Sequence, residues 1–123
     1  VQLNDTVDAA AMANVSGTWG FCGGGELMGW VFTLMADGQG ICYAISDEAS
    51  DSMSYLTGGL TADMKPGNKF TWKIVGGTNG YAHDFVLSNS SKGTYEHYHL
   101  VELEDGRLGF YQCEAGGHYQ RLP

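Results

Sequence analysis

The feature that most constrains this chain is a repeated alternation of apolar and polar residues, interrupted every few positions by glycine-containing turns. Phe70, Trp72 and Ile74, for example, alternate with Thr71 and Lys73. This period of two is typical of a strand with one buried face and one exposed face. Similar short segments follow one another to the end of the chain. Together they predict about eight antiparallel strands.

Two Asp-Gly pairs predict tight turns between such strands. Asp37-Gly38 and Asp105-Gly106 each suit a two-residue type I′ hairpin, in which both central residues need positive φ. Counting back from the first turn places its predicted cross-strand partners on one face: Leu34 with Ile41, Phe32 with Tyr43, and Trp30 with Ile45. The second turn predicts a further set of partners: Leu103 with Leu108, Val101 with Phe110, His99 with Gln112, and His97 with Glu114. Each register follows from its turn.

Local signals also predict what surrounds these hairpins. The apolar residues within Leu3–Ala13 predict one or two helical turns that plug one end of a barrel. The polar, acidic segment Asp47–Ser54 is predicted to be a loop, followed by a short strand at Tyr55-Leu56 and a turn at Met64–Gly67. We therefore expect an all-β fold, an up-and-down antiparallel barrel, with a lead-in at 1–14 and a single domain at 15–123.

Charge and chain length exclude several classes of partner. The 123 residues carry a formal net charge of -8, which argues against nucleic acid or an anionic membrane surface. No apolar run approaches the roughly 20 residues of a transmembrane helix. The chain begins at Val1 rather than Met, so we expect a signal or transit peptide to have been removed. The expected location is secreted, periplasmic or within an organelle lumen.

The cysteines and glycosylation sequons indicate little about chemistry. The three cysteines are Cys22, Cys42 and Cys113. They are too few for a disulfide scaffold, and their spacing is not that of metal ligands. Counting along the strands places them opposite the inward aromatic residues, so they are not expected to line a cavity. Three N-x-[ST] sequons, at Asn4, Asn14 and Asn89, would matter only in a eukaryotic secretory route.

A resemblance to a known family is carried by several motifs in order. These are Gly17-Thr18-Trp19, the Phe32–Gly40 hairpin, the Phe70–Ile74 strand, the Leu103–Leu108 hairpin and Tyr119-Gln120-Arg121. In this order the chain resembles, from 15 to 122, the small lipocalin-like barrels of the calycin group. The resemblance implies that Trp19 lies at the barrel floor and that Arg121 packs across its ring, as a structural pair. A cation over an indole face is a favourable contact.

Candidate binding residues fall into an aromatic interior and a polar mouth. The interior candidates are Trp30, Phe32, Tyr43, Trp72 and Phe85. The mouth candidates are His83, His97, His99, Gln112, Glu114 and Tyr119. Titratable groups that converge in a barrel mouth are costly to bury unless they are paired or bind a ligand. The same residues could instead be solvated and bonded to one another. Their spacing specifies neither a metal nor haem, and no cofactor is expected.

The leading interpretation is an exported barrel that binds a small, mainly apolar or amphipathic molecule in its interior. One alternative is an isomerase or cyclase on the same barrel, with His97, His99, Glu114 and Tyr119 transferring protons. The other alternative is a protein-interaction module, either a protease inhibitor or an accessory subunit of a larger complex. A protein partner is therefore an alternative to a small molecule. The sequence does not decide whether the chain is an enzyme.

Overall fold

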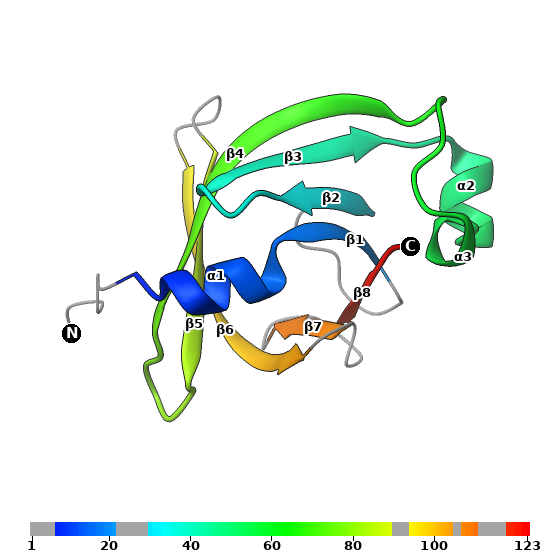
Figure 1. Cartoon of the computed structure of the whole chain (residues 1–123). Coiled ribbons are helices and arrows are strands. Elements are labelled where there is room, and N and C mark those ends of the chain that lie inside the picture. The colour runs from blue at the N-terminus through cyan, green and yellow to red at the C-terminus, as the bar shows by residue number, and fades with distance from the viewer. Residues whose placement is uncertain (1–6, 22–29, 90–93, 105–106, 111–117) are drawn as a thin grey trace.

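The computed structural model describes residues 7–21, 30–89, 94–104, 107–110 and 118–123. Eight antiparallel strands pair in sequence order, and the last strand pairs with the first, so the sheet closes into a barrel (Figure 1). The strands are β1 (Gly17–Phe21), β2 (Val31–Leu34), β3 (Gln39–Ala44), β4 (Lys65–Gly76), β5 (His83–Asn89), β6 (Thr94–Glu104), β7 (Arg107–Phe110) and β8 (His118–Arg121). The predicted all-β, up-and-down architecture is confirmed.

The barrel closes at a contact between Trp19 and Arg121. The two residues are cross-strand partners on β1 and β8, and the guanidinium carbon lies 4.4 Å from the indole centroid. Trp19 is fully buried, and its Nε1 donates a hydrogen bond to the carbonyl of Val15 at 2.8 Å. The predicted pair at the closed end is therefore confirmed, and it joins the first strand to the last.

Helix α1 (Ala9–Val15) plugs the end of the barrel at which β1 begins. Asp8 caps its first turn by accepting a hydrogen bond from the backbone N–H of Ala11 at 3.0 Å. Three side chains of α1 are buried in the interior cluster: Ala11, Met12 and Val15. The predicted lead-in helix is confirmed. Because successive strands are antiparallel, the β2–β3 and β4–β5 turns lie at the same end of the barrel.

Arg121 also holds the other end of α1. Its Nη1 donates to the carbonyl of Ser16 at 2.6 Å, and its Nη2 donates to the carbonyl of Asn14 at 2.8 Å. The last carbonyls of a helix have no partner within the helix, and a cationic side chain is a favourable donor to them. One arginine thus links the barrel closure to the plug.

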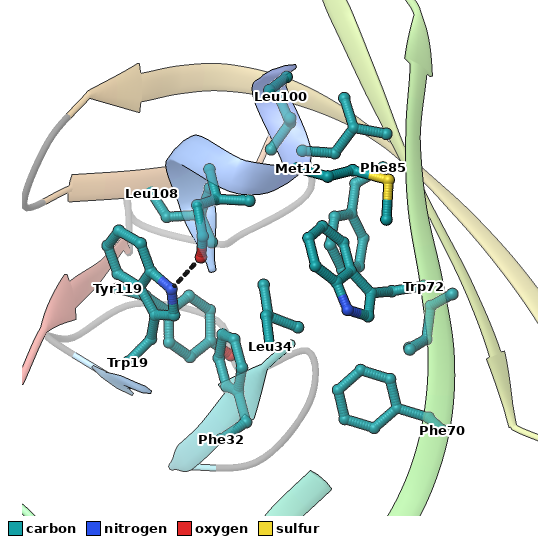
Figure 2. Close-up of a cluster of buried hydrophobic side chains, with 14 residues drawn as sticks. Met12, Trp19, Phe32, Leu34, Phe70, Trp72, Phe85, Leu100, Leu108 and Tyr119 are labelled. Carbon is teal, nitrogen blue, oxygen red and sulfur yellow. Dashed lines mark hydrogen bonds between the residues drawn. The ribbon is translucent and has the colours of Figure 1, made fainter. Parts of the chain in front are cut away.

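The interior of the barrel is packed with aromatic rings (Figure 2). Phe32 meets Tyr119 edge-on, with ring centroids 4.8 Å apart. Trp72 stacks on Phe85, with centroids 5.8 Å apart and an interplanar angle of 17°. The indole Nε1 of Trp72 donates to two carbonyls of the β2–β3 turn, those of Met35 and Gln39. These contacts fix the rings in place and fill the barrel next to α1.

The first hairpin has a three-residue loop, so its predicted register is wrong. The structure pairs Leu34 with Gly40 and Phe32 with Cys42. The N–H of Gly38 bonds to the Met35 carbonyl at 3.0 Å, and Gly38 has φ of 94°. This is a type I turn followed by a left-handed glycine, the usual three-residue hairpin. A shift of one residue moves every side chain of the strand to the other face.

That shift places Ile41, Tyr43 and Ile45 on the outer face of the barrel. Tyr43 and Ile45 pack there in a second apolar cluster, whose buried members are Val31, Tyr55, Met64 and Leu122. Two short helices, α2 (Asp47–Ser52) and α3 (Tyr55–Gly58), lie in the connection from β3 to β4, well apart from α1 (Figure 1). The outer apolar residues are covered by this connection.

The predictions for this connection are wrong as well. The acidic segment forms α2 because Ser46 caps it, accepting from the N–H of Ala49 at 3.1 Å, and Asp47 and Glu48 lie in its positively polarised first turn. The expected short strand at Tyr55-Leu56 is helix α3. The expected turn at Met64–Gly67 is largely strand, since β4 begins at Lys65.

The second hairpin follows its predicted register only next to the turn. Leu103 pairs with Leu108 as expected, but the register then shifts, and Leu100 pairs with Phe110. The predicted Val101–Phe110 pair is wrong because Val101 lies in an irregularity between Leu100 and Glu102 and is 53% exposed. A bulge places two residues opposite one. Leu100 therefore takes the place in the core that was expected for Val101. The predicted partners Gln112 and Glu114 lie outside the described residues.

Candidate functional site

The structure places most of the predicted aromatic lining inside the barrel. Four of these residues are buried in the interior cluster: Phe32, Trp72, Phe85 and Tyr119. Trp30 is half-buried and packs against the same cluster. Tyr43 is the exception, because the register shift places it on the outer face, where its hydroxyl accepts a hydrogen bond from Thr33 Oγ1 at 3.3 Å. Tyr119 was expected at a polar mouth, but it lies fully buried against Phe32.

Three half-buried side chains border the apolar interior, and we call them the border residues: Trp30, Cys42 and Tyr98. Each packs against the interior cluster. The prediction that Cys42 faces away from the aromatic interior is wrong, because it pairs with the inward residue Phe32. Trp30 precedes β2 and Cys42 lies late in β3, so both lie toward the end of the barrel opposite α1. Cys22 and Cys113 lie outside the described residues.

The ring of Phe70 packs closely on the neighbouring strand β3. It pairs across β4 and β3 with Gly40, and a Cβ added at Gly40 would collide with the Phe70 ring. The ring therefore lies directly on the β3 backbone, at a place where only glycine leaves room. Phe70 is 5% exposed. Its ring therefore belongs to the interior cluster and lies along the barrel wall.

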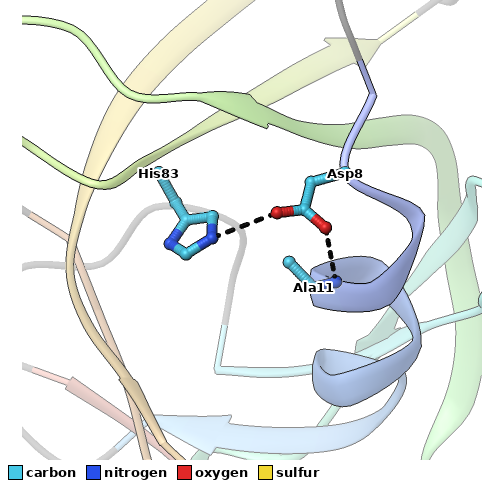
Figure 3. Close-up of polar contacts among 3 residues, drawn as sticks. All are labelled: Asp8, Ala11 and His83. Atoms are coloured by element: carbon cyan, nitrogen blue, oxygen red, sulfur yellow. Dashed lines mark hydrogen bonds and ion pairs between the residues drawn. The ribbon is translucent and has the colours of Figure 1, made fainter.

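His83 and Asp8 form a polar contact at the plugged end (Figure 3). His83 Nε2 lies 3.3 Å from Asp8 Oδ2, and the other carboxylate oxygen caps α1 at Ala11. The Ala11 hydrogen bond and, to a smaller extent, the imidazole of His83 lower the pKa of Asp8 below its usual value of 3.8. Hydrogen bonds to the charged form have this effect. His83 thus helps to hold the plug and lies apart from the mouth expected for it.

His99 and Asp84 form a second polar contact, on the outer wall of the barrel. Asp84 is fully buried, because the β4–β5 connection covers it. Its carboxylate accepts from Thr78 Oγ1 at 2.7 Å and lies 2.7 Å from His99 Nδ1, while the ring of Tyr81 stacks on His99 with centroids 4.4 Å apart. With the carboxylate ionised, Nδ1 must carry the proton, which makes Nε2 the basic nitrogen. Asp84 faces the outer wall because it alternates with the inward residue Phe85 along β5, and its burial there depends on how the connection folds.

The described residues of the proton-transfer group expected from the sequence do not lie together. His99 points to the outer wall beside Asp84, whereas Tyr119 lies inside the barrel. Gln112 and Glu114, and the side chain of His97, lie outside the described residues. Among the residues that the structure describes, no group of three or more His, Cys, Asp or Glu could hold a metal ion.

A cleft of about 380 Å³ lies on the outer wall beside the β2–β3 turn. It is lined by Asp37, Gly38, Gln39, Thr71, Trp72, Lys73, Val86 and Ser88. Thr71, Lys73, Val86 and Ser88 alternate along β4 and β5 with residues of the interior cluster, so the cleft is separated from the interior by the sheet. Most of the side chains that line it are polar.

In the part of the chain that the structure describes, no helix is long and apolar enough to cross a membrane. Comparisons with protein-family models, with curated proteins and with solved structures yielded no match. The coarser part of the resemblance, an antiparallel eight-stranded barrel, is shown by the strand pairing itself.

Proposed function

We propose that this chain is a lipocalin-like binding protein that holds a small, mainly apolar molecule inside the barrel, at the end opposite α1. The observation that carries the proposal is the position of Trp30 and Cys42, which lie toward that end, are half-buried and pack directly against the interior cluster. Apolar surface that continues from a packed core to accessible side chains is typical of small-molecule sites. The site would thus be formed by Trp30 and Cys42 beside the packed rings.

The barrel architecture supports the same proposal. A closed barrel has no exposed strand edge, and α1 covers one end with Ala11, Met12 and Val15 in the core. The end at α1 is therefore not the approach to the interior. The Trp19–Arg121 contact and the bonds of Arg121 to the C-terminal end of α1 support the lipocalin-like assignment.

Titration with N-phenyl-1-naphthylamine, a neutral fluorescent probe, tests the proposal. We expect saturable binding, with enhanced probe emission and quenching of tryptophan emission. Cys42→Phe adds a ring at the border of the interior and should weaken binding at least about tenfold, because overpacking a site costs on the order of 1–3 kcal/mol.

Ile41→Phe is the matched control for this substitution. It adds the same ring one residue away, on the outer face, and should leave the dissociation constant within about twofold of the parent, since surface changes are small. Near-ultraviolet circular dichroism checks that both variants are folded. A parent protein that shows no saturable binding, or a Cys42→Phe variant that binds as tightly as the Ile41→Phe variant, would contradict the proposal.

A further inference from the structure

We infer that the cleft on the outer wall binds a small polyol that carries one oxyanion, of the sugar-acid or sugar-phosphate class. This site is separate from the proposed interior site, because the sheet of β4 and β5 lies between them. The cleft has a volume of about 380 Å³, which falls within the range of small-molecule sites, about 300–1,000 Å³. The class of ligand follows from the polar groups that the strand register brings together there.

Three hydrogen-bonding side chains lie in a row across the strands at the cleft. Gln39 on β3 pairs with Thr71 on β4, and Thr71 pairs with Ser88 on β5. Paired residues point to the same face of a sheet, and neighbouring strands lie about 4.8 Å apart. All three residues line the cleft. The row therefore presents one amide and two hydroxyls close enough together for one small polar molecule to contact all three.

Two lysines flank the middle residue of this row. Lys69, Thr71 and Lys73 alternate along β4, so their side chains leave the same face of the strand at intervals of about 7 Å. Lys69 is exposed, and Lys73 is half-buried in the wall of the cleft. The whole chain has only six Lys and Arg residues against 14 Asp and Glu, so two cations beside one hydroxyl form a locally positive surface. Ammonium and hydroxyl donors together suit a carboxylate or a phosphate.

Asp37 adds an acceptor to the cleft at the β2–β3 turn. Its Oδ1 accepts a hydrogen bond from the backbone N–H of Gln39 at 3.0 Å, which holds the carboxylate beside the cleft that it lines. A carboxylate accepts hydrogen bonds from hydroxyl groups and repels a second anion. A ligand with one oxyanion toward the lysines and hydroxyl groups toward Asp37 therefore satisfies both kinds of group.

Three sugars of nearly equal size test which charge the cleft prefers. D-glucuronate is anionic, D-glucose is neutral, and D-glucosamine is cationic in slightly acidic buffer. Each is titrated at constant ionic strength into the ¹⁵N-labelled full chain, and the backbone amides of Thr71, Lys73 and Ser88 are followed. We expect saturable shifts with glucuronate, at an affinity at least about tenfold higher than that of glucose, and no saturation with glucosamine. Glucose 6-phosphate, titrated in the same way, distinguishes a phosphate from a carboxylate as the preferred oxyanion.

Two substitutions test the groups that bind the oxyanion. Lys73→Gln removes one of the two cations and should weaken glucuronate binding roughly tenfold. Lys65→Gln is the matched control, because Lys65 is exposed at the other end of β4 and carries the same charge. It should leave the dissociation constant within about twofold of the parent value, since distant exposed charges are screened. Thr71→Val removes the hydroxyl between the lysines without changing the charge, and it should weaken binding by about the same factor as Lys73→Gln.

Several results would overturn this inference. They are equal affinity for the three sugars, a Lys73→Gln variant that binds as tightly as the Lys65→Gln variant, and the absence of saturable shifts with both glucuronate and glucose 6-phosphate. Displacement of N-phenyl-1-naphthylamine by glucuronate would also contradict a separate site on the outer wall, whereas we expect the Cys42→Phe variant to bind glucuronate as the parent does. Should a variant fail to fold, the sugar series on the unaltered protein still decides.

Discussion

Arg121 lies over the ring of Trp19 and at the same time donates two hydrogen bonds to the C-terminal end of α1. The contact joins the first strand, the last strand and the plug at one point. Because β1 and β8 are adjacent there, the arginine stabilises both the closure of the barrel and the position of the helix that covers it.

Replacing Arg121 should therefore cost more than an ordinary surface change. Arg121→Met removes the cation over the indole and both hydrogen bonds, and we expect a loss of about 2–3 kcal/mol in the free energy of unfolding. Arg121→Lys should recover only part of this, since an ammonium lacks the planar fork that reaches both carbonyls. Urea denaturation measures the difference, and a methionine variant as stable as the parent would rule out this role.

Trp19 has the largest buried side chain at the closed end. Trp19→Ala should lower the free energy of unfolding by roughly 3–5 kcal/mol, the cost of deleting a buried aromatic side chain. Trp19→Phe keeps much of the apolar volume and should cost less. The two variants are compared by thermal and urea denaturation, and equal stability of Trp19→Ala and the parent would be incompatible with this packing.

The pH dependence of α1 follows from the lowered pKa of Asp8. A carboxyl whose pKa is lower in the folded state stabilises the fold above its unfolded pKa, and this stabilisation is lost as the pH falls through the folded pKa. We therefore expect the parent to lose stability as the pH drops below 3.8.

Asp8→Asn retains a capping side chain but has no charge to titrate. It should show a weaker loss of stability over the same acidic range. Melting temperatures measured across that range for both proteins provide the comparison, and identical pH profiles would show that Asp8 does not contribute.

We expect the free energy of unfolding to depend strongly on the contact between Asp84 and His99. His99→Ala leaves the buried carboxylate without its imidazole partner, and breaking a buried pair in this way costs on the order of 3 kcal/mol. Replacing Asp84 and His99 together by Asn and Phe should cost less than replacing His99 alone, because no charge then stays buried without its partner. A double-mutant cycle measures this coupling, and strictly additive effects would contradict it.

Alternation and turn residues predicted the class of fold and the helix before the barrel, and the resemblance to lipocalin-like barrels predicted the Trp19–Arg121 contact. Each wrong prediction of register depends on the local geometry of one turn or one bulge. An Asp-Gly pair is compatible with both two- and three-residue hairpins, and the choice of three moved Cys42 inward and Tyr43 outward. A bulge at Val101 cannot be read from alternation, since Val101 is as apolar as Leu100, which takes the core position.

Local sequence patterns also could not predict which residues are buried on the outer wall. Tyr55 belongs to a short helix because the α2–α3 connection folds back over Val31 and Leu122, and Asp84 is buried because another connection covers it. Both depend on tertiary contacts, which override local propensity. For the same reason, the predicted gathering of His83, His99 and Tyr119 at one mouth is replaced by three separate environments.

The most direct test of ligand binding inside the barrel is an NMR titration of ¹⁵N-labelled protein with naphthalene. We expect saturable shifts at the indole N–H of Trp30 and the backbone amide of Cys42, and much smaller shifts at Lys73 and Ser88 in the outer cleft. Saturable shifts confined to Lys73 and Ser88, with Trp30 and Cys42 unchanged, would contradict an interior site.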